Sequence, residues 1–161
     1  MNGAARQKSL FERLRHFAFH KYFLLTRGLT LGVRGLVLDE AGRVFLIRHT
    51  YVRGWHLPGG GVEIGETLLE ALERELMEEG NIEIIGAARL IGVYFNGHAS
   101  RRDHVAVFVI RDFRRSAPKA PDREIAEAGF FAPDALPEGT TEGTRARILE
   151  VMGQAPVAAD W

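Results

Sequence analysis

Apolar and polar residues alternate with a helical period near the start of the chain. From Ser9 to Leu25, leucine and phenylalanine recur every three to four positions, and charged residues and histidines lie opposite. Ser9 suits an N-cap and Gly28 suits a C-terminal stop. We predict an N-terminal helical extension over residues 1–27. Its apolar stripe is expected to contact its own domain or a second copy of the chain, which would give a homodimer.

A second helical period runs over residues 67–79. Thr67 and the glutamate three residues later have the spacing of a capping box, and neither glycine nor proline interrupts the stretch. The leucines define an apolar face, but Glu79 projects into that face and Glu75 lies beside it. Glu78 is on the same side, so three carboxylates crowd one part of the predicted helix.

Such crowding is costly because like charges repel, and partial burial raises the cost further. Arg74 lies near the cluster at helical spacing and would offset part of it. A hard divalent cation would accept the carboxylate oxygens directly. A solvated acidic helix face is the alternative interpretation of the cluster on its own.

Short runs rich in β-branched and aromatic residues predict strands. Leu29–Leu38 and Arg43–His49 are predicted to pair as a β-hairpin through the turn at residues 39–42. Further strands are expected at 55–57, at 82–95 with a break near Gly86, at 104–110 and at 129–132. Polar loops are expected at 96–103 and 114–122, and a final helix at 144–152.

Strands that alternate irregularly with helices predict an α/β (α+β) fold. We expect one domain over residues 28–153, with a mixed β-sheet covered by helices on both faces. Residues 154–161 are expected to form a loose C-terminal tail. The length of 161 residues suits one such domain.

Composition excludes several classes of site and partner. Lysine and arginine total 21 and balance 21 aspartates and glutamates, so no DNA partner is expected. The chain has no cysteine, which excludes disulfides, thiolate metal sites and cysteine nucleophiles. The apolar run at 17–25 is too short to span a bilayer and no signal-peptide cleavage site follows it. We predict a cytoplasmic protein without a membrane partner.

Pro58 is followed by three glycines, Gly59, Gly60 and Gly61, whose backbone can approach a ligand closely. Gly60, five residues, Glu66, seven residues, then residues 74–79 and the apolar Ile82 resemble the Nudix box of the MutT-like hydrolases. Residues 54–60 and 129–131 are also similar to the family, so most of 29–152 fits. One departure is Asn81, where the family has glycine. Asn tolerates the left-handed conformation of a helix C-cap better than other non-glycine residues.

The resemblance implies a Nudix-type α/β/α sandwich that uses Mg²⁺, with Mn²⁺ as a possible substitute. Its implied metal ligands are the Gly60 carbonyl, Glu75, Glu78 and Glu79. Arg74 would orient these carboxylates.

The other implied roles concern the general base and the substrate. Glu75 or Glu124 would act as the base, although a surface position explains Glu124 equally well. Glu66 would steady Arg74. The remaining substrate-binding candidates are Arg48, Arg53, His56 and Gly59, grouped here with Glu66.

The implied reaction is Mg²⁺-dependent hydrolysis of a pyrophosphate bond in a nucleoside diphosphate linked to another moiety. Nucleotide sugars, ADP-ribose, dinucleoside polyphosphates and nucleoside triphosphates all remain open as substrates. The alternative is an inactive nucleotide-binding regulatory module on the same fold. A third hypothesis gives the N-terminal helix a nucleic-acid or protein partner, against which the neutral charge weighs.

Overall fold

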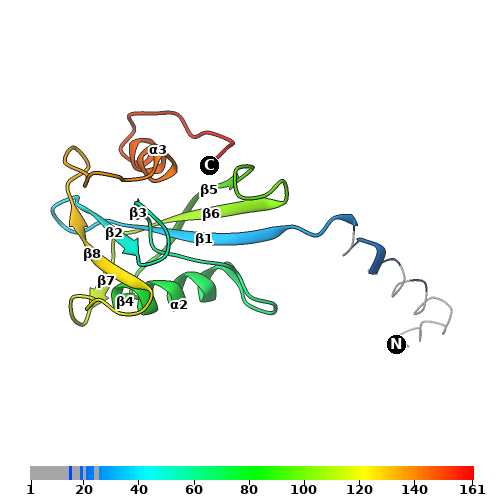
Figure 1. Cartoon of the computed structure of the whole chain (residues 1–161), viewed down its shortest axis with the longest axis horizontal. Helices are drawn as coiled ribbons and strands as arrows, with labels where there is room; N and C mark the ends of the chain where they lie inside the picture. The colour runs from blue at the N-terminus through cyan, green and yellow to red at the C-terminus, as the bar shows by residue number, and fades with distance from the viewer. Residues whose placement is uncertain (1–14, 16–18, 20, 24–25) are drawn as a thin grey trace, which may run out of the picture.

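The computed structural model describes Arg15, Phe19 and residues 21–23 and 26–161. Its elements in chain order are β1 Thr30–Val37, β2 Val44–His49, β3 Trp55–His56, α2 Leu68–Gly80, β4 Ile82–Ile84, β5 Arg89–Phe95, β6 Asp103–Ile110, β7 Phe113–Arg115, β8 Ile125–Phe131 and α3 Glu142–Val151. The strands lie between α2 on one side and α3 on the other (Figure 1).

The strands form two three-stranded sheets and one two-stranded sheet. The first has the order β1-β6-β5, in which β6 is parallel to β1 and antiparallel to β5. The second has the order β3-β2-β8 and is antiparallel, and β4 pairs with β7. The predicted mixed arrangement of strands between helices is confirmed.

Apolar side chains of the strands form two buried clusters, one that includes α2 and one that includes α3. Val33 and Val37 of β1 pack with Leu72 and Leu76 of α2 in one cluster. The alternate side chains of β1 and β6 pack toward Ile148 of α3 in the other cluster. The burial of both faces explains why β6 reads as a nearly continuous apolar run.

The predicted hairpin between residues 29–38 and 43–49 is wrong. The chain does turn tightly there, because the Asp39 carboxylate accepts hydrogen bonds from the backbone of Ala41 and Arg43. Beyond the Leu38–Val44 bridge, however, β1 and β2 belong to different sheets. One edge of β1 is occupied by β6, and the other edge is hydrogen-bonded to the glycine-rich loop at residues 58–62.

The other predicted elements are found with shifted ends. The helix predicted at 67–79 spans Leu68–Gly80, and the break near Gly86 separates β4 from β5. The loop prediction for 114–122 was wrong at its start, where β7 pairs with β4.

The C-terminal tail is not loose. The backbone of Phe95 accepts a hydrogen bond from Trp161 N at 3.0 Å and donates one to the Ala159 carbonyl at 2.9 Å. The Trp161 ring meets Tyr94 edge-on at 6.2 Å. The tail therefore covers the free edge of β5.

The predicted N-terminal helix at Ser9–Leu25 lies mostly outside the described residues. Those that are described, such as residues 21–23, are helical, and Phe19 and Tyr22 are exposed. The described residues 21–23 lie away from the sheets (Figure 1). Within the described part of the chain, no helix is long and apolar enough to cross a membrane.

Candidate active site

Helix α2 is capped at both ends, by Thr67 and by Asn81. The Thr67 side chain accepts a hydrogen bond from Glu70 N, and the Glu70 carboxylate accepts one from Thr67 N at 2.8 Å, which completes the predicted capping box. At the other end, Asn81 takes the left-handed conformation with φ 54° and ψ 35°. The predicted C-cap role of Asn81 is confirmed. Because both ends of α2 are capped, the positions of its acidic residues are well defined.

Glu79 is the most buried of the acidic residues on α2, with 7% of its surface exposed. Its Oε2 accepts a hydrogen bond of 2.7 Å from Gly59 N. Burial raises the pKa of Glu79 to about 7, and the negative charges of Glu75 and Glu124 add to the rise. The Gly59 N–H and the Arg34 guanidinium act in the opposite direction. The expectation that Glu79 enters the apolar side of the helix is confirmed.

Arg74 connects the helix to the loop that precedes it. Its Nε donates to Glu66 Oε1 at 3.0 Å, and its Nη2 donates to Glu66 Oε2 and to the Gly61 carbonyl, both at 3.1 Å. Its Nη1 donates to Glu75 at 2.6 Å and lies 3.7 Å from Glu78. The hydrogen bond from Arg74 lowers the pKa of Glu66. The contact between Glu66 and Arg74 is thus the one expected from the sequence.

The glycine-rich loop lies against these carboxylates. A Cβ atom at Gly60 would collide with the Glu75 carboxylate, and one at Gly59 would collide with the backbone of β1. Gly59 also has φ +136°, which other residues rarely adopt. Glycine is therefore required at both positions for the loop to approach α2.

The donor atoms suit a hard divalent cation. Glu75, Glu78, Glu79 and the Gly60 carbonyl offer the oxygen ligands that Mg²⁺ prefers. The raised pKa of Glu79 indicates a buried carboxylate that its neighbours compensate only in part, and a cation would stabilise its charged form. Among the described residues, no three His, Asp or Glu side chains converge as a complete ligand set, so waters or substrate phosphates would supply further ligands.

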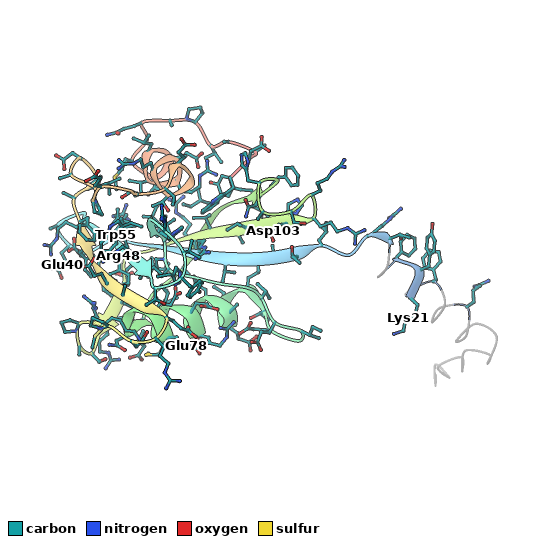
Figure 2. All side chains as sticks on the ribbon, in the orientation of Figure 1. Lys21, Glu40, Arg48, Trp55, Glu78 and Asp103 are labelled. Carbon is teal, nitrogen blue, oxygen red and sulfur yellow. The ribbon has the colours of Figure 1, made fainter. Side chains whose placement is uncertain are left out.

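These potential ligands differ in their surroundings. The Glu75 carboxylate is bound by Arg74, and the Gly60 carbonyl already accepts a hydrogen bond from Val33 N at 2.9 Å. The Glu78 side chain is 62% exposed, on the outer side of α2 (Figure 2).

The other predicted residues come from the strands and loops beside α2. Glu124 is exposed but close enough to influence the charge of Glu79. His56 Nε2 lies 3.0 Å from the Arg53 carbonyl oxygen, and burial lowers the pKa of His56. Arg48 instead donates two hydrogen bonds to Glu127, at 2.9 and 2.7 Å, and lies beside Trp55 (Figure 2).

Three residues near Glu79 were missed in the sequence. Arg34 of β1 donates to the Leu57 and Gly59 carbonyls. His49 at the end of β2 has its Nε2 3.7 Å from Glu79 Oε1, and burial lowers the pKa of His49. The Tyr51 ring lies 5.0 Å from that of His49. An arginine inside the apolar run of β1 was a visible signal, whereas His49 and Tyr51 carried none.

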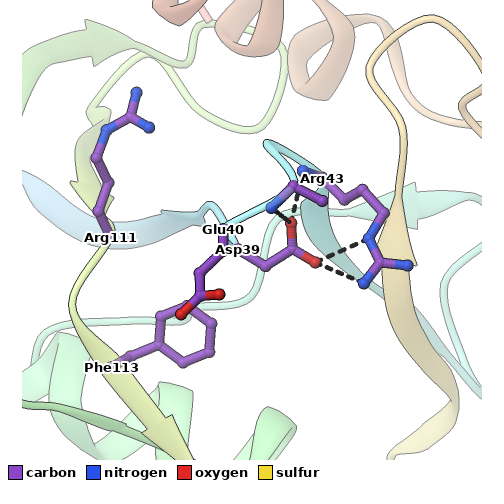
Figure 3. A pocket seen from close by; sticks show the side chains of 6 residues that line it. Asp39, Glu40, Arg43, Arg111 and Phe113 are labelled. Carbon is purple, nitrogen blue, oxygen red and sulfur yellow. Dashed lines mark hydrogen bonds and ion pairs between the residues drawn. The ribbon is translucent and has the colours of Figure 1, made fainter.

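A polar pocket beside this group is lined by residues 48–54. A separate pocket at the β1–β2 turn is lined by Asp39, Glu40, Ala41, Arg43, Arg111 and Phe113 (Figure 3). The second pocket contains none of the box residues, and Asp39 and Arg43 are paired with each other within it. The first pocket includes His49, whose Nε2 lies 3.7 Å from Glu79 Oε1 of α2.

A family model of the NUDIX domain matches residues 28–152. The chain belongs to the Nudix family. It is 31% identical over 126 residues to the MutT-like protein of Streptomyces ambofaciens, covering 78% of this chain and 79% of that protein. It is 34% identical over 106 residues to an ADP-ribose pyrophosphatase of Methanocaldococcus jannaschii, covering 63% and 62%.

A solved structure of a MutT Nudix hydrolase from Burkholderia pseudomallei has a TM-score of 0.66 and 26% identity, covering 76% of this chain and 97% of that one. The Nudix fold predicted from the box is therefore confirmed, and the protein is a hydrolase that acts on phosphorus-containing anhydrides. Nudix hydrolases in general use divalent metal ions.

Proposed function

We propose that this Nudix hydrolase cleaves, with Mg²⁺, a pyrophosphate bond in a nucleoside diphosphate linked to another moiety. The observation that carries the proposal is Glu79, a carboxylate buried on the inner face of α2 and held by Gly59 N. A buried carboxylate whose pKa is raised beside further carboxylates is typical of a functional site.

The metal ligands in this proposal are Glu75, Glu78, Glu79 and the Gly60 carbonyl. A divalent cation bound there would neutralise phosphate charge and make the attacking water more acidic. Arg74 would hold Glu75 in place, which its 2.6 Å hydrogen bond to that carboxylate supports.

The general base is either Glu75 or Glu124. The Glu75 carboxylate already accepts a 2.6 Å hydrogen bond from Arg74, whereas Glu124 is exposed and within electrostatic range of Glu79. This contrast favours Glu124, and a Glu124→Gln variant that retained full kcat would transfer the role to Glu75.

Substrate phosphates would meet the polar pocket at residues 48–54 and the adjoining His56 and Gly59. Arg53 is exposed there and suits a phosphate contact. Arg48 would first have to leave Glu127, to which it donates two hydrogen bonds. Glu66 accepts two hydrogen bonds from Arg74. We therefore assign Glu66 the role of holding Arg74 in place, and not a direct contact with the substrate.

Candidate substrates are nucleotide sugars, ADP-ribose, dinucleoside polyphosphates and nucleoside triphosphates. The similarity to an ADP-ribose pyrophosphatase supports assaying ADP-ribose first. A nucleotide panel with product identification by mass spectrometry, run with Mg²⁺, with Mn²⁺ and with EDTA, tests the proposal. We expect a nucleoside monophosphate to be released only with metal.

Nucleotide binding without turnover would indicate the inactive regulatory module instead. A homodimer through the N-terminal extension and a cytoplasmic location both stay predictions.

A further inference from the structure

Arg34 interrupts an otherwise apolar segment of β1. Its neighbour Val33 and the following Leu36 and Val37 are fully buried. A guanidinium in such a position loses hydration, and it persists only where hydrogen bonds and opposite charges compensate. The groups that compensate for Arg34 belong to the glycine-rich loop and to α2.

The side chain of Arg34 completes a continuous set of hydrogen bonds between β1 and the loop. Its Nη1 donates to the Leu57 carbonyl at 3.0 Å and also to the Gly59 carbonyl. The backbone N–H groups on either side bind the remaining carbonyls of this stretch: Gly35 N donates to Pro58 O and Val33 N donates to Gly60 O, both at 2.9 Å. Four consecutive carbonyls, from Leu57 to Gly60, are therefore held by β1.

These bonds fix the peptide group that contacts Glu79. Peptide groups are planar, so holding a carbonyl oxygen also sets the direction of the N–H in the same group. The group between Pro58 and Gly59 binds Gly35 N through its oxygen and Glu79 through its N–H, at 2.7 Å. Arg34 holds the peptide groups immediately before and after it.

We propose that Arg34 is a positioning residue, which fixes the glycine-rich loop so that Gly59 N holds the Glu79 carboxylate ready for a divalent cation. The negative charges of Glu79 and Glu75 in turn stabilise the partly buried guanidinium. The inference rests on the proposed function, because it assigns Arg34 a role toward the metal ligands of that site.

Positioning and charge have opposite effects on metal affinity. If Arg34 acted only as a positive charge near the ligands, its removal would strengthen cation binding. If Arg34 acts by positioning, its removal weakens cation binding, because the support of a ligand is lost. The sign of the change therefore distinguishes the two roles.

The test uses Mn²⁺ alone, titrated into the full chain and followed by the EPR signal of free Mn²⁺. Arg34→Met keeps a long side chain but removes the hydrogen bonds, and we expect its Mn²⁺ affinity to fall by about tenfold. Arg111→Met is the matched control. It removes the same charge from an exposed position that makes no hydrogen bond or ion pair with the described residues, and we expect wild-type affinity.

Hydrogen exchange of the Gly59 amide, measured by NMR without metal, is the second readout. We expect faster exchange in Arg34→Met than in the wild type and in Arg111→Met. Unchanged or tighter Mn²⁺ binding in Arg34→Met overturns the inference, and so does unchanged exchange.

Two further outcomes are decided by the same readouts. If Arg34→Met does not fold, Arg34→Lys takes its place, because lysine keeps the charge without the guanidinium; a smaller loss of affinity and protection is then expected, and wild-type values overturn the inference. If the wild type itself binds no Mn²⁺, the proposed function fails, while Gly59 exchange still decides whether Arg34 positions the loop.

Discussion

At the residue scale, the Glu79 carboxylate is held in its charged form only at an energetic cost. It is buried beside the apolar side chains of α2, and the charges of Glu75 and Glu124 further disfavour its ionised form. The 2.7 Å hydrogen bond from Gly59 N offsets only part of this cost. A buried carboxylate with a raised pKa lowers the stability of the fold. Its presence at this position therefore indicates a functional role, such as binding a metal ion.

The raised pKa of Glu79 predicts a specific pH dependence of stability in EDTA. The pKa is about 7 in the folded protein and 4.5 for an ordinary glutamate, so the folded state keeps its proton to higher pH. The free energy of unfolding should therefore fall as pH rises from about 4.5 to 7, by on the order of 3 kcal/mol from this group, and then level off. Glu79→Gln should lack this component.

Urea unfolding of the wild type and Glu79→Gln across this pH range measures the effect. The difference in unfolding free energy between the two should grow with pH in favour of the variant. A difference that stays constant with pH would show that Glu79 ionises normally in the folded protein.

The sequence located the residues of α2 because helical spacing is local. The position of Glu79 on the apolar face followed from helical spacing, and the link between Glu66 and Arg74 was implied by the resemblance to the Nudix box. Arg34 and His49 were missed because they come from β1 and β2, and their approach to Glu79 depends on how separate sheets pack.

At the element scale, the ends of α2 were predictable because caps depend on adjacent residues. The pairing of β1 was not, because the sequence gives no local sign that the glycine-rich loop occupies one of its edges. The same limit applies to the tail, whose pairing with Phe95 joins residues far apart in the chain.

The left-handed conformation of Asn81 predicts the effect of two substitutions at the end of α2. Asn81→Ala should lower the unfolding free energy by about 1 kcal/mol, because alanine adopts φ near +54° only with strain. Asn81→Gly, which restores the residue type of the family box, should stay within about 0.5 kcal/mol of the wild type. Chemical denaturation measures both, and equal stability of the alanine and glycine variants would contradict the assigned cap.

At the scale of the whole molecule, the C-terminal tail joins β5 to α3. Arg147 and Glu150 of α3 form an ion pair at 2.7 Å in which both side chains are 2% exposed. Arg147 also donates to the Asp160 carbonyl, and the Glu150 carboxylate accepts from Tyr94 and from Ala158 N. The tail therefore helps to shield a buried charge pair.

Trp161→Ala should destabilise the protein by about 2 kcal/mol, because it uncovers Tyr94 and the guanidinium of Arg147. Val157, in the same tail, is 57% exposed, so Val157→Ala is the control and should change stability by less than about 0.5 kcal/mol. Thermal unfolding compares them, and equal melting temperatures of the two variants would mean that the tail contributes little to stability.

The central claim is that this Nudix domain hydrolyses its substrate through the carboxylates of α2. The most direct measurement is kcat at saturating Mg²⁺ for Glu79→Gln against Glu83→Gln, on whichever nucleotide the panel identifies. Glu83 lies on β4 and pairs with Arg114 at the surface, so its variant should retain kcat within about twofold. Glu79→Gln should lose roughly two to three orders of magnitude. Full activity in Glu79→Gln, and likewise in Glu78→Gln, would contradict the account.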